Sequence, residues 1–301
     1  MMSPDVRAAV EAAVAAALGP GHAIERAAPA SGGCIHDSFV VQSGSVRLFV
    51  KTNGAAFGSA FAAEADGLAA LIAAGMRAPR PLGHGVAASH AYLVMEYLDL
   101  TGRGDWAAMG RALAAMHRGT GGQTGQRGQR FGWRRDNFIG STPQRNRGHD
   151  DWTGFWRDAR LLPQLALAAR NGLGSRLIDA GERLAAMLPR LLAGHAPQAS
   201  LLHGDLWSGN AAFLADGSPV LFDPAVYFGD READLAMTEL FGGFPRSFYD
   251  AYNKAWPLDP GYELRRDLYN LYHVLNHANL FGGGYAAQAQ ALIGRLLSEA
   301  R

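Results

Sequence analysis

The most informative segment of this chain reads Leu201-Leu-His-Gly-Asp-Leu-Trp-Ser-Gly-Asn210, and Leu221-Phe-Asp-Pro224 follows it closely. Asn210 lies five residues after Asp205, and Asp223 lies thirteen residues after Asn210. Two carboxylates and an amide at these positions offer a base for a hydroxyl group and oxygen ligands for Mg²⁺. A lone His-Gly-Asp or Asp-Pro usually marks only a turn or a cap. Three residue types at two set spacings instead favour a catalytic segment.

Protein kinases place their catalytic Asp and a metal-binding Asn five residues apart, and a second metal-binding Asp follows. Phosphoryl transfer requires little covalent chemistry from the protein. It requires a carboxylate near the attacking hydroxyl and ligands that hold Mg²⁺ on the nucleotide phosphates. We therefore predict that Asp205 is the catalytic residue and that Asn210 and Asp223 bind the metal.

Hydrophobic periodicity predicts the two lobes of such a fold. Strands are expected at residues 24–28, 38–42, 46–51 and 91–97, and a central helix is expected at 59–74. Helical patterns dominate the rest, apart from a short hairpin expected around Asp216-Gly217. We predict a bilobal α+β, protein-kinase-like fold. A small antiparallel-sheet, nucleotide-binding lobe would span residues 1–97, and a larger, mainly helical catalytic and substrate-binding lobe would span 98–301.

Composition narrows the classes of function. The 301 residues suggest about two domains or lobes, and 48% apolar residues suffice for a sizeable core. A net charge of +1 gives no reason to expect nucleic acid or a membrane surface as a partner. The chain has no run of eighteen apolar residues, and residues 3–18 read as an amphipathic helix, so neither a membrane span nor a signal peptide is expected. We therefore expect a cytoplasmic protein that is a monomer or a homodimer.

Lysine usage singles out Lys51. The chain contains two lysines, Lys51 and Lys254, against twenty-six arginines. A compact ammonium suits a phosphate site in a tight cleft, where a planar guanidinium has less room. Kinases pair such a strand-ending lysine with a helix glutamate, and Glu64 lies thirteen residues later in the predicted helix. The alternative is a surface lysine and a solvated glutamate; the Asp205 segment favours the pair.

Two segments are expected to contact the nucleotide through the backbone. Glycines let a backbone approach phosphates, and Gly32 and Gly33 lie in the turn between the first two predicted strands, ahead of the Lys51 strand. A plain hairpin turn is the alternative. At the end of the last predicted strand, Glu96 and Leu98 occupy the place of a kinase hinge, where backbone groups bind the adenine edge.

The acceptor side is indicated by Trp207, two residues after Asp205. The CH face of a sugar packs on an indole ring, and the ring N–H donates to a hydroxyl, so a carbohydrate-like acceptor is favoured over a core tryptophan. Asp136 and Asn137, with Gln144 nearby, are candidates to hydrogen-bond the substrate. They would serve equally well to satisfy backbone groups of their own loop. Both interpretations stay open.

The single cysteine, Cys34, permits neither an intrachain disulfide nor a thiolate metal site. It is either a small buried hydrophobe or an exposed loop thiol that is oxidised by pairing between two chains. The Gly-rich segment 119–130 is predicted to be a solvated loop, and a substrate-binding role for its arginines is the alternative.

Over nearly its whole length, the chain resembles the fructosamine kinase family, also called ketosamine 3-kinases, which is related to aminoglycoside and choline phosphotransferases. The motifs that carry the resemblance are Gly32-Gly-Cys-Ile35, Phe49-Val-Lys51, Glu64, the segments 131–144 and 203–210, Asp223-Pro-Ala-Val-Tyr227, Gly229-Asp-Arg-Glu232 and Leu240-Phe-Gly-Gly-Phe244. The Trp-Ser-Gly-Asn ending and the Phe-Gly-Trp segment separate this family from its aminoglycoside relatives.

The resemblance implies phosphorylation, with ATP and Mg²⁺, of O3 on a ketose attached to an amine, such as a free or protein-linked fructosamine or ribulosamine. The product decomposes and frees the amine, which would make the protein a deglycation repair enzyme. The resemblance also implies that Asp234 pins the catalytic loop and that His203 braces it. The rivals are another small-molecule kinase of the aminoglycoside or choline type, a regulatory pseudokinase and a nucleic-acid binder. The presence of Lys51, Asp205 and Asp223 disfavours the pseudokinase.

Overall fold

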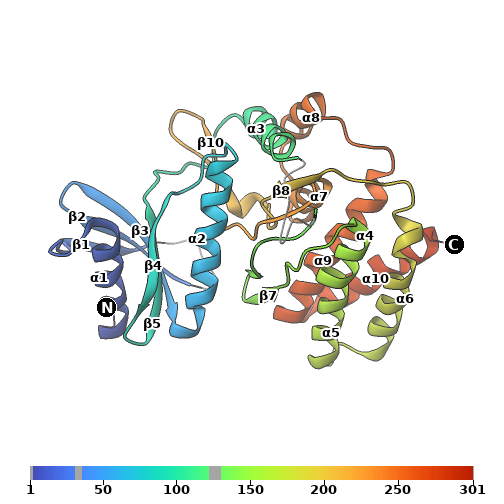
Figure 1. Ribbon diagram of the computed structural model, residues 1–301, viewed down its shortest axis with the longest axis horizontal. Coiled ribbons are helices and arrows are strands. Elements are labelled where there is room, and N and C mark those ends of the chain that lie inside the picture. The colour runs from blue at the N-terminus through green and yellow to red at the C-terminus, as the bar shows by residue number, and fades with distance from the viewer. Residues whose placement is uncertain (1–2, 31–35, 122–129, 301) are drawn as a thin grey trace. The chain divides into compact units, whose positions relative to one another are not determined.

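The computed structural model describes residues 3–30, 36–121 and 130–300 (Figure 1). The predictions for Gly32, Gly33 and Cys34, and most of the loop 119–130, lie outside these described residues. The chain forms two compact units. The first unit comprises Met1–Asp105 and Asn210–Ala225, and the second comprises Trp106–Gly209 and Val226–Arg301. The expected division after residue 97 did not include the return of residues 210–225 to the first unit.

The first unit is built on a five-stranded sheet in the order β1-β2-β3-β5-β4, in which every neighbouring pair is antiparallel. Its strands are β1 (Arg26–Pro29), β2 (Asp37–Ser43), β3 (Val46–Gly54), β4 (Pro81–Ala87) and β5 (His90–Glu96). Side chains alternate between the two faces of a strand. Along β3, the buried Leu48 and Val50 therefore point to one face and Lys51 to the other. The antiparallel sheet predicted from periodicity is confirmed.

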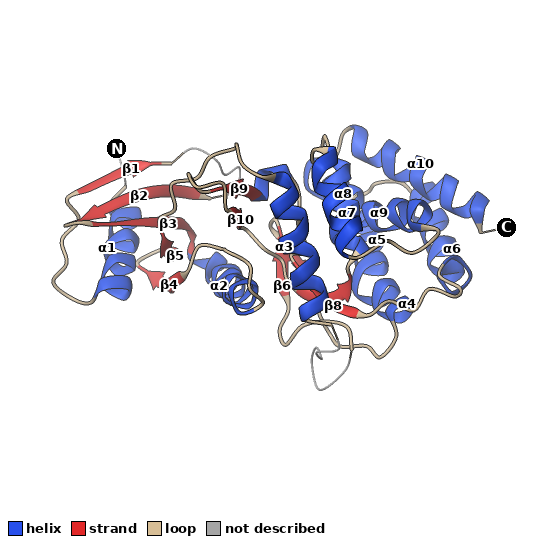
Figure 2. Ribbon diagram, turned by 90° about the horizontal axis from the view of Figure 1, so that it is seen from above, coloured by secondary structure: helices blue, strands red, loops and turns tan. Residues whose placement is uncertain are grey.

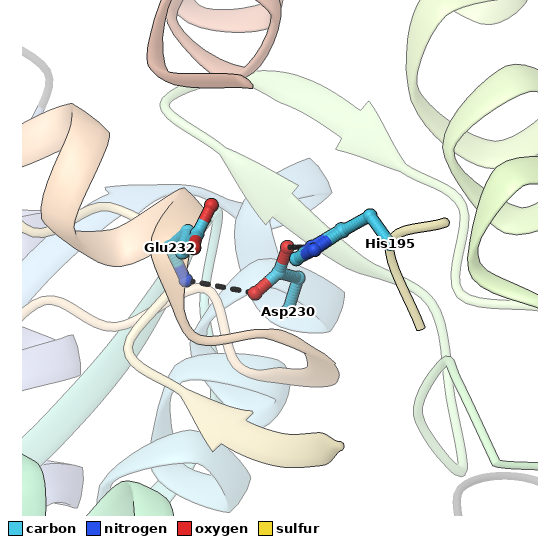
Figure 3. A group of neighbouring side chains, drawn as sticks. All are labelled: His195, Asp230 and Glu232. Carbon is cyan, nitrogen blue, oxygen red and sulfur yellow. Dashed lines mark hydrogen bonds and ion pairs between the residues drawn. The ribbon is translucent and has the colours of Figure 1, made fainter. Parts of the chain in front are cut away.

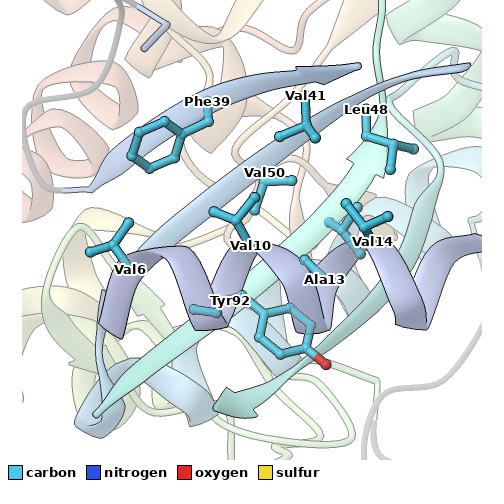
Figure 4. Close-up of a cluster of buried hydrophobic side chains, with 11 residues drawn as sticks. Val6, Val10, Ala13, Val14, Phe39, Val41, Leu48, Val50 and Tyr92 are labelled. Carbon is cyan, nitrogen blue, oxygen red and sulfur yellow. The ribbon is translucent and has the colours of Figure 1, made fainter. Parts of the chain in front are cut away.

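Helix α1 (Pro4–Leu18) covers the face that carries Leu48 and Val50 (Figure 4). Its N-terminus is capped because the Ser3 hydroxyl accepts a hydrogen bond from the Val6 N–H at 3.3 Å. Val10 is fully buried against the sheet, as the four-residue spacing of valines along this helix predicts. The amphipathic helix expected at residues 3–18 is confirmed.

Helix α2 (Gly58–Ala73), preceded by the short turn η1 (Ala55–Phe57), packs against β4 and β5. By length and composition alone, the helical segment Ala55–Ala73 meets the requirements of a membrane span, with a mean hydropathy of 1.3. A core helix satisfies the same requirements. This one buries Phe61 and Leu68 and carries Glu64, which binds Lys51 of β3. We assign it as the central helix of the first unit.

The segment that returns to the first unit contains a hairpin of β9 (Ala211–Phe213) and β10 (Pro219–Leu221). The Asp216 carboxylate stabilises its turn by accepting a hydrogen bond from the Ser218 N–H at 2.9 Å. Gly217 has a φ of 82°, a conformation that side chains disfavour. The hairpin predicted around Asp216-Gly217 is confirmed.

The second unit is mainly helical (Figure 2). Its helices are α3 (Trp106–Gly119), α4 (Trp152–Phe155), the π-helical η3 (Trp156–Leu161), α5 (Leu162–Arg170), α6 (Ser175–Leu191), α7 (Glu232–Leu240), α8 (Arg246–Ala255), α9 (Tyr262–Phe281) and α10 (Gly284–Glu299). Two short antiparallel pairs complete it: β6 (Asn137–Ile139) with β7 (Thr142–Gln144), and β8 (Ala199–Leu202) with β11 (Tyr227–Asp230). Eleven residues of α9 are buried, which makes this helix the centre of the unit's core.

Candidate active site

Lys51 lies at the centre of the candidate nucleotide side, which belongs entirely to the first unit. Its Nζ lies 2.6 Å from Oε1 of Glu64 and 2.5 Å from Oδ1 of Asp223. Burial by itself would lower the pKa of Lys51, but the charges of both carboxylates outweigh it and raise that pKa. The ammonium therefore stays charged. The predicted contact between Lys51 and Glu64 is present, and Asp223 is a second partner that the sequence did not indicate.

Asn210 and Asp223 flank the open end of the β9–β10 hairpin. The backbone hydrogen bonding of the hairpin continues one residue beyond the two strands, where the Phe222 N–H donates to the Asn210 carbonyl at 3.1 Å. Asp223 adopts a φ of 57°, in the left-handed region that few residues other than glycine enter, and its side chain is 44% exposed. Carboxylate and amide oxygens are hard donors of the kind Mg²⁺ prefers, so the chemistry of this pair fits the ion.

His36 is a neighbour of this site that the sequence did not single out. Its Nδ1 lies 2.9 Å from the Asn53 amide nitrogen, and its ring contacts Phe61 at 4.9 Å between centroids. Burial, reinforced by the Lys51 ammonium, lowers the pKa of His36 to about 4. This histidine is therefore neutral near pH 7 and adds no charge beside Lys51.

The hinge candidates, Glu96 and Leu98, also lie in the first unit. The Glu96 carboxylate accepts two hydrogen bonds from the Arg77 guanidinium, at 2.7 and 3.0 Å, and these lower its pKa. The Glu96 N–H donates to the Arg80 carbonyl at 2.9 Å. Leu98 is half-buried just beyond β5. Adenine binding at this segment stays a prediction.

The loop that carries Asp205, the predicted catalytic residue, follows β8 in the second unit. The Asp234 carboxylate accepts hydrogen bonds from the His203 N–H at 2.7 Å and the Gly204 N–H at 2.8 Å, and it contacts the buried His117 at 3.2 Å. The Asp205 N–H in turn donates to His203 Nδ1 at 3.3 Å. The predicted pinning role of Asp234 and bracing role of His203 are confirmed. His203 is fully buried, which suits a structural role rather than that of a base.

Trp207, two residues after Asp205, is 37% exposed, so the core interpretation is wrong. Gly209 allows this pose, because a Cβ at that position would lie 2.3 Å from the ring. The ring meets Phe241 edge-on at 6.2 Å, and Phe241 lies 4.8 Å from His277. The sequence analysis assigned no role to either residue: Phe241 lies in the Leu240-Phe-Gly-Gly-Phe244 motif, and His277 lies in none.

The segment around Asp136 and Asn137 shows the contacts of the loop-stabilising alternative. The Asn137 side chain is buried; its amide donates to the Val226 carbonyl, and its oxygen accepts from Gln144 and Asn146, all at 2.8 Å. One oxygen of the exposed Asp136 accepts from the Asn146 N–H at 2.7 Å. Protein groups therefore satisfy the side-chain hydrogen bonding of Asn137 and Gln144 without a ligand. Substrate contact by Asp136 and Asn137 stays a prediction.

Among the described residues, one further group has side chains that could ligate a metal: His195, Asp230 and Glu232, whose ligand atoms lie within 4.8 Å of one another (Figure 3). The ligand atoms of this group already bind one another or other side chains of the protein. Asp230 binds His195 and Tyr269, each at 2.6 Å, and Arg265 contacts both oxygens of Glu232 at 2.6 and 2.8 Å. Burial acts to raise the pKa of Asp230, but the His195 contact outweighs it and lowers that pKa. We interpret this group as a buried ion network.

A buried lysine held by a helix glutamate and a hairpin aspartate, together with a pinned loop that presents another aspartate, defines a phosphotransferase of protein-kinase-like fold. The family model for fructosamine kinase matches residues 6–299. The chain therefore belongs to the fructosamine kinase family.

Similar proteins agree with this assignment. The chain is 49% identical over 274 residues, covering 89% of this chain and 88% of the relative, to a Synechocystis sp. protein named "Probable ketoamine kinase". It is 42% identical over 265 residues, covering 87% of this chain and 79% of the relative, to the chloroplastic protein-ribulosamine 3-kinase of Arabidopsis thaliana. A crystal structure of a candidate fructosamine-3-kinase from Haemophilus somnus matches with a TM-score of 0.85 and 29% identity, covering 96% of this chain and 97% of that chain.

Proposed function

We propose that this protein is an ATP-dependent ketosamine 3-kinase, which phosphorylates O3 of a ketose joined to an amine. The names of its relatives, ketoamine kinase and protein-ribulosamine 3-kinase, support this acceptor class. The structural observation that carries the proposal is the Lys51 ammonium, buried and held at 2.6 Å and 2.5 Å by Glu64 and Asp223. A buried cation fixed on a strand of the sheet is what a phosphate clamp requires.

On the nucleotide side, Lys51 would bind the phosphates, and the backbone of Gly32 and Gly33 would approach them. The Glu96 and Leu98 backbone would bind adenine. Asn210 and Asp223 would hold Mg²⁺, which neutralises charge on the β- and γ-phosphates when it is bound.

On the acceptor side, Asp205 would take the proton from the O3 hydroxyl. The O3 oxygen then forms its bond to the γ-phosphorus as the bond from that phosphorus to the β–γ bridging oxygen breaks, so that ADP leaves. Trp207 would stack on the sugar ring, and its exposed face beside the pinned loop supports that role. Asp136 and Asn137 would complete the acceptor site.

The cellular role follows from the acceptor. Fructosamines and ribulosamines arise when sugars glycate amines, and a phosphate at O3 makes the adduct unstable. We therefore propose deglycation of free or protein-linked amines in the cytoplasm, by a monomer or a homodimer.

The decisive test is ADP release by the purified protein with Mg·ATP, in the presence and absence of a synthetic ribulosamine or fructosamine. We expect strong stimulation by the ketosamine, abolished in Asp205→Ala, while Mg·ATP affinity stays close to wild type because the base acts on the acceptor. Asp250→Ala, at an exposed position, serves as the control and should be fully active. An active Asp205→Ala would refute the assignment of the base, and no stimulation by any ketosamine would refute the acceptor class.

A further inference from the structure

The β9–β10 hairpin is anchored to the chain on both sides of the hinge segment, residues 96–98. The first anchor is Arg77, in the connection between α2 and β4. Its carbonyl accepts a hydrogen bond at 3.0 Å from the N–H of Leu221, two residues before Asp223. Its guanidinium makes the two hydrogen bonds to Glu96, at 2.7 and 3.0 Å. One residue therefore contacts both the hairpin and the hinge.

The second anchor follows the hinge. Thr101 and Phe213 exchange two backbone hydrogen bonds, at 2.8 and 2.9 Å. Three residues later, Gly104 lies so close to the Phe213 ring that a Cβ there would be 2.1 Å from Cγ. A methyl group at position 104 would therefore have to displace β9, the strand that begins directly after Asn210.

We propose that Arg77, Thr101 and Gly104 are positioning residues that hold the metal-binding hairpin in register with the adenine-binding hinge. All the groups involved belong to the first unit. The physical reason is that metal ligands must be held to about 0.5 Å, and a misplacement of about 1 Å costs on the order of 100-fold in function. The inference rests on the proposed function, because it takes the hinge and the hairpin as the two ends of one Mg·ATP site.

The chain offers a matched pair of variants for the test. A Cβ at Gly104 meets Phe213, whereas a Cβ at Gly102 meets nothing within 4 Å, and neither glycine has a positive φ. We would titrate a non-hydrolysable ATP analogue calorimetrically into both alanine variants, with and without Mg²⁺. Gly104→Ala should bind the analogue about tenfold more weakly with Mg²⁺ and nearly normally without it. Gly102→Ala should match the wild type in both conditions.

Circular dichroism reports whether Gly104→Ala folds. Arg77→Gln supplies a second variant, because it keeps the backbone anchor and removes the ion pair to Glu96; it should weaken Mg²⁺-dependent binding in the same direction. The proposal is overturned if Gly104→Ala and Arg77→Gln both bind the analogue like the wild type. It is also overturned if affinity falls equally with and without Mg²⁺, since the hairpin would then not be the affected part. An unfolded Gly104→Ala leaves Arg77→Gln to decide by the same criteria.

The calorimetric readout separates this inference from the proposed function. A wild-type protein that binds the analogue with Mg²⁺ but phosphorylates no ketosamine contradicts the acceptor class, while the Gly104 and Gly102 comparison still tests the anchors. If the wild-type protein has ketosamine kinase activity but Gly104→Ala and Arg77→Gln bind the analogue normally, only the proposed positioning role of the anchors is contradicted.

Discussion

Lys51 shows how one residue acquires its role in steps. Its place at the end of the predicted strand 46–51, in a chain with two lysines, already makes it a candidate phosphate ligand. The structure extends this strand, β3, to Gly54 and so places Lys51 inside the sheet. Alternation along β3 turns it away from the α1 face, and α2 supplies Glu64 on the other face. The contact with Asp223, 172 residues away in sequence, adds the second carboxylate. Asp223 holds a left-handed conformation there, and strained backbone of this kind concentrates at functional sites.

Replacing this ammonium tests the site directly. Lys51→Met keeps the apolar stem but removes the charge, and we expect kcat/KM for ATP to fall by about 100- to 1,000-fold, as when one preorganised donor is lost. Lys254→Met removes the only other lysine, which is exposed near the end of α8, and should leave kinetics unchanged. Steady-state kinetics of both variants is the measurement. A Lys51→Met enzyme with near wild-type kcat/KM would show that Lys51 does not bind phosphate.

Among the elements, helices and strands with a regular apolar pattern were predictable, and short polar ones were not. Helix α1 could be predicted because a buried valine recurs at every fourth position along it. Strands β6 and β7 have three residues each, too few for a period to emerge. They are held by the amide network of Asn137 and Gln144, whose bonds join residues seven or more positions apart.

The packing of α1 makes a stability prediction at this scale. Val10→Ala removes two buried carbons from the interface with the sheet, and we expect the free energy of unfolding to fall by about 2 kcal/mol. Glu11→Ala on the same helix touches only a surface pair with Arg7 and should change stability by less than about 0.5 kcal/mol. Urea denaturation of both variants measures the difference. Equal stabilities would mean that α1 contributes little to the core of the first unit.

Two histidines that burial keeps neutral, one in each unit, contribute to the pH dependence of the stability of the whole molecule. Burial lowers the pKa of His36 to about 4 and that of His273 to about 3. In the unfolded chain both would take up a proton near pH 6.5. Because the unfolded state then binds more protons than the folded state, stability is complete above pH 6.5 and falls as the pH is lowered toward these folded-state values.

We therefore predict that Tm decreases as the pH is lowered from 6.5 to 4. His273→Phe should flatten part of this decrease, since the buried His273 alone contributes a slope of about 1.4 kcal/mol per pH unit in this range. His22→Phe, at an exposed position, should leave the slope unchanged. Thermal melts at several pH values measure the slope for each variant. A slope in His273→Phe equal to that of the wild type would contradict the buried-histidine account.

The local sequence was sufficient to predict most of the secondary-structure elements and to identify the residues that lie in motifs. Periodicity marks four strands of the sheet (β1, β2, β3 and β5), α1, α2 and the helical character of the second unit, because burial of one face recurs at a fixed interval. Motif spacing marks Asp205, Asn210 and Asp223, because five and thirteen residues of chain limit how far apart these groups can lie. The family resemblance identified Asp234, whose predicted bonds to the loop that carries Asp205 are present at His203 and Gly204.

Contacts between distant segments required the tertiary structure. No local pattern indicates that Lys51 meets Asp223, that Trp207 neighbours Phe241, or that Gly104 leaves room for the Phe213 ring. The same holds for the return of residues 210–225 to the first unit. Each of these depends on where two separately formed elements pack, and packing is decided by the fit of side chains from across the chain rather than by the residues next to them.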